Sequence, residues 1–309
     1  MLYLTSQQIP AAQTSLCPTF KRRIVHTMNQ IHIITDAGSD IVNPDRADLT
    51  VLPMTIRFGE EEFQDGVNLT HREFYEKLIE SDTLPTTSQP SPFLFENAIR
   101  SILEQGDIPL VITISSKLSG TWQSACIAAG EFDEKIHIVD SESVAVGEKA
   151  LVEYALRLKD QGANIDTIVE ILEHEKKQLC VLGLLDTLEY LQKGGRISKT
   201  VAIAGSLLSI KPVVTVTDGE VQLLGKARGS KQGNNFLIQK IQERGVDFSR
   251  PIALGYTGLS DVLLQKYIED SRSLWEGHAD SLSLGTIGGA IGTHVGPGAI
   301  AVAFFANRI

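Results

Sequence analysis

Short apolar segments of strand length alternate with amphipathic helical segments between Ile31 and about residue 160. Runs of this kind, rich in β-branched side chains, are typical of buried strands. When a helix follows each strand, consecutive strands lie parallel and the helices cover both faces of the sheet. The pattern therefore predicts a Rossmann-like α/β domain over residues 30–175. Its expected elements are strands over 31–35, 51–57, 110–114 and 136–139 and helices over 92–104, 120–130 and 144–160.

One more helix is expected to begin just after Leu69. Thr70 or Asn68 is the candidate N-cap, because short polar side chains accept hydrogen bonds from the first free amides of a helix. Helical spacing predicts a single apolar face made of Phe74, Leu78 and Ile79.

The pattern changes after about residue 175, and we predict a second α+β domain over residues 176–309. Asp218-Gly219 joins two strand-like runs and is the clearest hairpin signal in the chain. Gly194-Gly195 is typical of a helix C-terminus. Residues 281–307 lack Asp, Glu, Lys and Arg, but the glycines and Pro297 favour loop and strand segments over a membrane helix. The expected elements are strands over 179–184, 213–217, 220–224, 252–256, 282–286 and 299–305 and helices over 187–193, 231–243 and 260–273.

Composition restricts the possible partners of the chain. Its 309 residues carry a net charge of −10, which argues against nucleic acid, because phosphate neutralisation needs a basic face. The three cysteines are far apart in sequence, as is typical of free thiols in the cytoplasm. No signal peptide follows the basic triplet at 21–23. Residues 1–29 are expected to be an extension, either disordered or preceding a true start at Met28.

A loop rich in hydroxyl groups connects the strand over 110–114 to the next helix. The first amides of a helix lack internal partners and favour an anion, and Ser119 and Thr121 can add hydroxyl donors. Ser119 is thus a candidate anion ligand, although a simple helix cap or a nucleophile also fits these residues. A nucleophile is the weakest of the three, since no G-x-S-x-G elbow is present.

Other candidate residues lie far from this loop in sequence. The hydroxyls of Thr86-Thr87-Ser88 join Ser119 at one sheet edge if both follow parallel strands. His294 lies among glycines that permit close approach of a ligand, or it is a structural histidine. Arg196 and Arg228 also neighbour glycines and fit either phosphate contacts or a solvated surface. No metal-ligand spacing, Walker A motif or dinucleotide-binding unit is present in the sequence.

Six motifs in chain order resemble the DegV family, and together they extend from about residue 31 to the end of the chain. The matching segments are Ile34-Thr-Asp-Ala-Gly-Ser-Asp40, Thr87-Ser-Gln-Pro90, Ser115-Ser-Lys-Leu-Ser-Gly-Thr121, Lys193-Gly-Gly-Arg-Ile-Ser198, Ile210-Lys-Pro212 and Ile291-Gly-Thr-His-Val-Gly-Pro-Gly298. The first departs slightly, with Ala37-Gly38 where Ser-Thr is frequent in the family.

The resemblance implies two α/β domains with a tunnel between them that binds one long-chain fatty acid. It assigns the carboxylate to Thr87, Ser119 and His294, with Ser115, Ser116 and Gly120 as the supporting loop. It assigns Arg196 and Arg228 to contacts with a kinase partner or with the phosphoryl group. The acyl tail is expected to supply most of the binding energy, at about 0.8 kcal/mol per buried methylene.

In bacteria, the resemblance further implies, such a protein is the binding subunit of a fatty acid kinase. A separate ATP-binding subunit phosphorylates the bound carboxylate, and the acyl phosphate enters phospholipid synthesis. The chain itself would then have no catalytic residue, no cofactor and no metal. Two alternatives stay open at this point, namely a stand-alone lipid carrier or regulator and a self-sufficient kinase or hydrolase.

Overall fold

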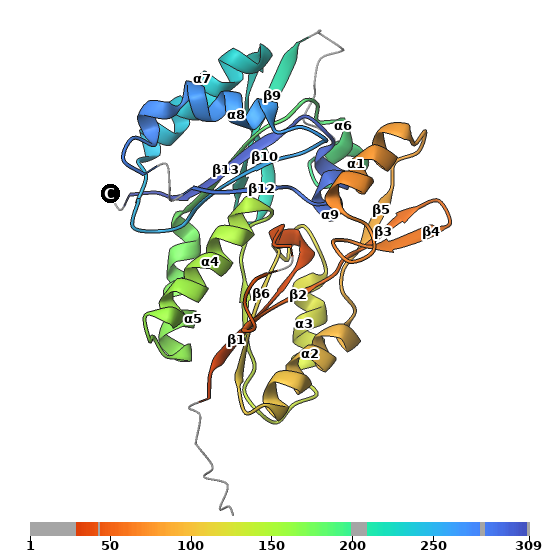
Figure 1. Cartoon of the computed structure of the whole chain (residues 1–309), viewed down its shortest axis with the longest axis vertical. Coiled ribbons are helices and arrows are strands. Elements are labelled where there is room, and N and C mark those ends of the chain that lie inside the picture. Colours follow the sequence, from red (N-terminus) through yellow and green to blue (C-terminus); the bar gives the residue numbers. More distant parts are fainter. Residues whose placement is uncertain (1–28, 43, 199–208, 279–281, 308–309) are drawn as a thin grey trace, which may run out of the picture.

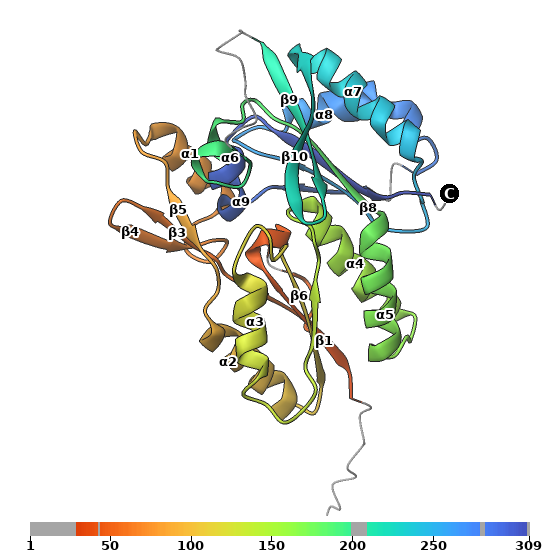
Figure 2. The same ribbon diagram turned by 180° about the vertical axis from the view of Figure 1, so that it is seen from behind.

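The computed structural model describes residues 29–42, 44–198, 209–278 and 282–307. The expected extension at 1–29, apart from its last residue, and the choice between Met1 and Met28 lie outside the described residues. Figures 1 and 2 show two large sheets, one above the other, with helix α4 between them and a smaller sheet to one side. The expected fatty-acid tunnel between the two halves would therefore lie between these two large sheets.

The N-terminal half forms a parallel sheet with the strand order β2-β1-β6-β7. Helices α2 and α3 pack on one face against Ile34 and Val111. Helices α4 and α5 pack on the other face against Ile33 and Leu110. This is the predicted Rossmann-like arrangement. The strands are β1 (Ile31–Asp36), β2 (Leu49–Leu52), β6 (Ile108–Thr113) and β7 (His137–Asp140), and the helices are α2 (Pro92–Glu104), α3 (Thr121–Ala129), α4 (Val146–Asp160) and α5 (Ile165–Glu175).

The C-terminal half forms a six-stranded mixed sheet with the order β10-β9-β8-β13-β11-β12, in which only β11 and β12 pair in parallel. The β9–β10 hairpin turns at Asp218 and Gly219 with positive φ at both residues, as expected for that pair. Helices α7 and α8 cover one face (Figure 1). The elements are β8 (Leu179–Leu184), β9 (Ile210–Thr217), β10 (Glu220–Arg228), β11 (Ile252–Tyr256), β12 (Leu282–Thr286), β13 (Ile300–Phe305), α6 (Glu189–Lys193), α7 (Gly229–Arg244) and α8 (Val262–Asp270).

The predicted strand over 51–57 is wrong, because the chain leaves one sheet and enters another within it. Strand β2 ends at Leu52, Pro53 follows, and β3 (Thr55–Phe58) begins a small antiparallel sheet with the order β4-β3-β5. Proline has no amide hydrogen for a ladder, which fits a break at this point. The other strands are β4 (Glu61–Gln64) and β5 (Thr86–Ser88), and β5 carries Thr87.

Helix α1 (His71–Glu80) follows β4, and its N-cap is Thr70, one of the two predicted candidates. The side chains of Thr70 and Glu73 form a reciprocal capping box. The predicted apolar face is wrong at one position, since Ile79 is 59% exposed whereas Tyr75 is fully buried. Tyr75 contacts the C-terminal half of the chain, since its hydroxyl donates to the carbonyl of Ile287 at 2.9 Å.

A short helix, α9 (Gly289–Val295), occupies a segment that the sequence assigned to loop. Its glycines allow close packing rather than loop formation. A Cβ at Gly289 would lie 2.5 Å from the Ile56 side chain, and one at Gly292 would lie 2.5 Å from the Tyr75 hydroxyl. Helix α9 thus packs directly on α1 and β3, and it carries His294.

Helix α4 connects the two large sheets through one continuous core. Its buried face contacts Ile33 and Leu110 of the parallel sheet and also Val181 and Ala303 of the mixed sheet. The proposed boundary between residues 175 and 176 coincides with the end of α5, and the division into domains stays a prediction. In the part of the chain that the structure describes, no helix has the length and apolar character needed to span a bilayer.

Candidate functional site

An apolar cavity lies between the carboxyl end of the parallel sheet and the face of the mixed sheet that is turned away from α7. Its empty space is about 880 Å³ when the open mouth is included. Alternate residues of β8 face it, while the residues between them face α7. The apolar lining comprises Met54, Ile114, Leu118, Val144, Ala145, Val181, Gly183, Leu185, Leu191, Val214, Val216, Val221, Ile287, Ala290, Ile291, Val295, Ala299, Ile300 and Ala301.

Polar side chains line the cavity at few points. Four of them are residues predicted from the sequence, Thr87, Ser119, Arg196 and His294, and the fifth is Thr215. The hydroxyl of Thr215 donates to the carbonyl of Val181 at 2.9 Å, so it is satisfied within the protein. The other four come from four separate regions of the sequence, and the fold brings them to one cavity.

His294 and Thr87 are directly paired. The Oγ1 atom of Thr87 lies 2.9 Å from Nε2 of His294, and the direction of the hydrogen bond depends on the imidazole tautomer. Nδ1 of His294 is buried and has no hydrogen-bond partner among the described residues. Burial, and secondarily the positive charge of Arg196, lowers the pKa of His294 to about 4. The imidazole is therefore neutral at pH 7 in the ligand-free protein.

Gly194 makes room for this imidazole. A Cβ at Gly194 would lie 2.2 Å from Nδ1 of His294. The neighbouring Gly195 has a φ of +71°, which side-chain-bearing residues rarely adopt. The sequence assigned both glycines to the end of α6, but only Gly195 meets a conformational demand, and Gly194 is required by the approach of His294.

Ser119 reaches the cavity from the loop between β6 and α3. Its hydroxyl lies 2.9 Å from Oγ1 of Thr121, and either oxygen can donate. The backbone amides of Leu118 and Ser119 both donate to the carbonyl of Ser115, at 3.0 and 3.1 Å, which closes the loop into a tight turn. The turn presents Leu118 and Ser119 to the cavity.

The supporting residues Ser115, Ser116 and Gly120 do not line the cavity. Ser115 is buried, and its hydroxyl donates to the carbonyl of Gly219 at 2.7 Å, which ties the loop to the β9–β10 hairpin. Gly219 has to lack a side chain there, because a Cβ would lie 2.5 Å from the Ser115 hydroxyl. The family resemblance implied that Ser115 supports the carboxylate site. In the structure the Ser115 hydroxyl instead donates to a backbone carbonyl in the C-terminal half of the chain.

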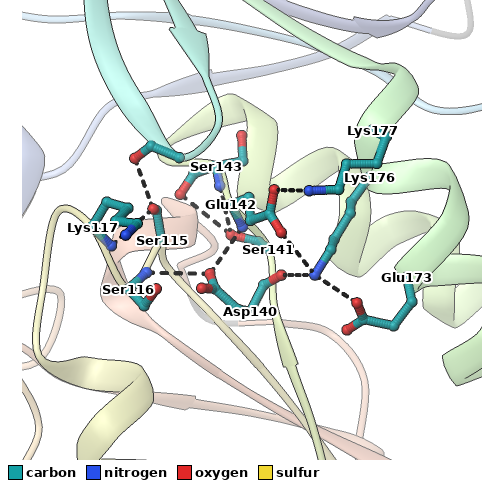
Figure 3. A network of polar contacts seen from close by, with 11 residues as sticks. Ser115, Ser116, Lys117, Asp140, Ser141, Glu142, Ser143, Glu173, Lys176 and Lys177 are labelled. Atoms are coloured by element: carbon teal, nitrogen blue, oxygen red, sulfur yellow. Dashed lines mark hydrogen bonds and ion pairs between the residues drawn. The ribbon is translucent and has the colours of Figure 1, made fainter.

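A polar network anchors the same loop from the opposite side (Figure 3). The amides of Ser116 and Glu142 donate to Oδ1 of Asp140 at 3.2 and 3.0 Å. Lys176 donates to the carbonyl of Asp140 at 2.9 Å and pairs with the carboxylate of Glu142 at 3.3 Å. The loop carrying Ser119 is thus held by the end of β7 and by the segment that follows α5.

The two predicted arginines differ in their surroundings. Nη1 of Arg196 donates to the carbonyl of Gly194 at 2.7 Å, and Nε donates to the carbonyl of Leu118 at 3.2 Å. Arg196 thereby connects the end of α6 to the Ser119 loop beside His294. Arg228, the last residue of β10, is exposed and is not among the residues that line the cavity.

The apolar wall of the cavity could not be predicted from the sequence, because its members are ordinary apolar residues on many different elements. One signal was available, since Gly183 interrupts the strand sequence Leu-Cys-Val-Leu-Gly-Leu. A glycine inside a strand often marks the close approach of a ligand or another backbone. Gly183 indeed faces the cavity.

Comparison with known proteins gives the family. Residues 30–307 match the family described as "Uncharacterised protein, DegV family". A DegV domain-containing protein of Caldanaerobacter subterraneus is 33% identical over 287 residues, which cover 90% of this chain and 99% of the relative.

Solved structures share the fold along nearly the whole chain. A DegV family protein of Thermus thermophilus, described with fatty acid binding, has a TM-score of 0.81 at 30% identity and covers 90% of this chain and 100% of its own. A fatty-acid-binding DegV family protein of Streptococcus agalactiae has a TM-score of 0.77 at 27% identity, with 91% and 100% covered. The fatty acid kinase B3 protein of Streptococcus pneumoniae, loaded with linoleic acid, has a TM-score of 0.79 at 24% identity and shows the fold alone, with 90% and 100% covered. The chain belongs to the DegV family.

Proposed function

We propose that this protein binds one long-chain fatty acid, with its carboxylate at Thr87, Ser119 and His294 and its tail in the apolar cavity. The observation that carries the proposal is the shape of the site, an apolar cavity with the four predicted polar side chains on its lining. An amphiphile with one polar end fits this distribution better than a nucleotide or sugar. The fatty-acid-binding relatives from Thermus thermophilus and Streptococcus agalactiae support the same ligand class.

The head group would be held by neutral donors beside one cation. Thr87 and Ser119 carry hydroxyl groups that can donate to a carboxylate, and His294 can donate from either ring nitrogen depending on its tautomer. Hydrogen bonds to an ionised acceptor are about twice as strong as bonds between neutral groups. Arg196 lies close enough to lower the pKa of His294, and an arriving carboxylate would oppose that effect. The site can therefore take up a negative charge without leaving it unpaired.

The tail would supply most of the affinity. Burying a chain of 16 methylenes contributes about 13 kcal/mol before the costs of association. The head group then fixes the orientation of the ligand. This division predicts that changes at the polar end weaken binding moderately, whereas changes that shorten the cavity discriminate among chain lengths.

We further propose that a separate ATP-dependent kinase subunit phosphorylates the bound carboxylate and that this chain has no catalytic activity alone. The acyl phosphate would serve phospholipid synthesis in the cytoplasm. In this proposal Arg196 contacts the phosphoryl group from the cavity lining, and the exposed Arg228 contacts the partner. Positive charge at both places would stabilise the charge that develops during phosphoryl transfer.

The test of ligand binding is native mass spectrometry of gently purified protein, which should show one bound fatty acid. Thr87→Val removes one donor while keeping the shape of the side chain, and it should weaken binding about tenfold, the effect of one buried hydrogen bond. Thr215→Val is the matched control, since its hydroxyl is already paired with Val181 and its methyl group would still face the cavity. Wild-type protein that binds no acid between fourteen and eighteen carbons would reject the proposal.

The kinase role needs a separate assay. ATP and a fatty acid should give acyl phosphate only when this chain and the kinase subunit are mixed. Arg228→Ala should slow that reaction and leave fatty acid affinity unchanged. Turnover by this chain alone would contradict the division of labour, and normal turnover by the Arg228 variant would contradict the role of that arginine.

A further inference from the structure

The helix that carries His294 has no local N-terminal cap. Its N-cap position is Gly288, which has no side chain, and the next two residues are Gly289 and Ala290. The first amides of a helix need acceptors from elsewhere when they are buried. In this protein the acceptors come from a segment more than 200 residues earlier in the chain.

Asp65 supplies two of these acceptors. Its Oδ1 accepts from the amide of Gly289 at 3.1 Å, and its Oδ2 accepts from the amide of Ala290 at 2.7 Å. Asp65 directly follows β4 and is 4% exposed. One buried carboxylate therefore satisfies two consecutive amides at the positive end of α9.

Two further side chains hold the residues just before α9. Oδ1 of Asp40 accepts from the amide of Gly288 at 2.7 Å. The hydroxyl of Tyr75 donates to the carbonyl of Ile287 at 2.9 Å. The fit is close, because a Cβ at Gly288 would lie 2.6 Å from Nε2 of His71 and 3.1 Å from Oδ2 of Asp65. Four consecutive residues, Ile287 to Ala290, are thus fixed by side chains from the N-terminal half.

The same helix forms one wall of the cavity. Ala290, Ile291, His294 and Val295 all line it, and their spacing places them on one face of α9. A rigid short helix moves as a unit, so an anchor at its first turn sets the position of His294 in its last turn. The distance between His294 and Thr87, 2.9 Å, is sensitive to any shift of this helix.

We infer that Asp65 is a positioning residue for the head-group site, acting through α9 to hold His294 against Thr87. The inference rests on the proposed fatty acid function and names a residue that does not line the cavity. Asp40 and Tyr75 act in the same way through Gly288 and Ile287.

The test compares Asp65→Asn with wild-type protein, using palmitate as the ligand. Asparagine keeps the size of the side chain but offers one acceptor oxygen and turns an NH₂ group toward the second amide. Palmitate should bind about tenfold more weakly, because a displaced His294 would no longer form its charge-assisted hydrogen bond to the palmitate carboxylate. The ring resonances of His294, read by NMR in the ligand-free protein, should titrate at a different pH from those of wild type.

The control is Asn164→Ala, which removes a comparable cap from α5, where the Asn164 side chain accepts from the amide of Thr167 at 2.9 Å. This variant should lose thermal stability, bind palmitate within twofold of wild type and leave the His294 resonances in place. If both variants weakened palmitate binding equally, Asp65 would act only through the overall stability of the protein, and the inference would be overturned.

Tyr75→Phe keeps the inference testable if Asp65→Asn does not fold, since it removes a single hydroxyl. It should weaken palmitate binding, and it should shift the pH at which His294 titrates in the same direction as Asp65→Asn does. Wild-type affinity and a wild-type His294 titration in the folded variants would overturn the inference. Failure of wild-type protein to bind any fatty acid would reject the proposed function instead, while the His294 titration would still report on the position of α9.

Discussion

Gly183→Val tests whether the acyl tail occupies the cavity along β8. Val181 and Gly183 of this strand and Leu185, the residue that follows it, face the cavity in alternation. A Cβ at Gly183 would lie 3.1 Å from Cγ2 of Val214 and 3.6 Å from Cδ2 of Leu185, both of which belong to lining residues. The added side chain therefore points into the space that the tail would occupy, and Val214 has to yield only slightly.

The size of the effect follows from the volume that valine adds. Its three side-chain carbons displace roughly three methylenes of the ligand, at about 0.8 kcal/mol each, for a loss of about 2.4 kcal/mol. That loss corresponds to a roughly 60-fold weaker Kd for a ligand long enough to reach Gly183. A short acid that ends before this point should bind as it does to wild type.

Isothermal titration with saturated acids of 8 to 18 carbons measures both effects. Cys180→Val is the matched control on the same strand, because Cys180 packs toward α7 and does not line the cavity. Thermal melting of both variants establishes that each is folded. An equal loss of affinity for all chain lengths, or no loss for the longest acid, would refute the assignment of the tail to this cavity.

Three further changes give separate tests. Ser115→Ala removes the donor to Gly219 and should lower the free energy of unfolding by about 1 kcal/mol without changing palmitate affinity; a large fall in affinity would return Ser115 to the head-group site. Burial raises the pKa of Glu148 well above its usual range, so Glu148→Gln should melt within a few degrees of wild type at pH 7, and a collapse would show that the residue is ionised. The pKa of His294 is lowered from 6.5 to about 4, so its contribution to stability is present above pH 6.5 and is lost as the pH falls toward 4; an NMR titration midpoint near 6.5 in ligand-free protein would contradict this.

Local signals predicted most elements well. The N-cap at Thr70, one of two candidates, the Asp218-Gly219 turn and the strand over 252–256 depend on residues within a few positions of one another, and the structure shows all three. The prediction failed where the partners are distant. The predicted strand over 51–57 breaks because its two halves belong to different sheets. Helix α9 forms where its glycines pack closely against the side chains of α1 and β3.

The predicted polar site shows the same division. Thr87, Ser119, Arg196 and His294 were named from their motifs, and the fold places all four on one cavity. The roles of Ser115 and Gly194 depended on the residues they meet, Gly219 and His294, which are remote in sequence. A pattern of single residues cannot show which backbone atom will come within hydrogen-bond reach.

The sequence by itself determined the alternation of strands and helices, the main turns and caps, and the family. Those properties follow from side-chain periodicity and from backbone preferences that act over a few residues. Only the tertiary structure decided that the apolar residues of both halves enclose one cavity, that burial leaves His294 neutral, and that Asp65 caps the helix carrying it. Each of these depends on desolvation or on contacts between segments far apart in the chain, which arise only when the two halves pack together.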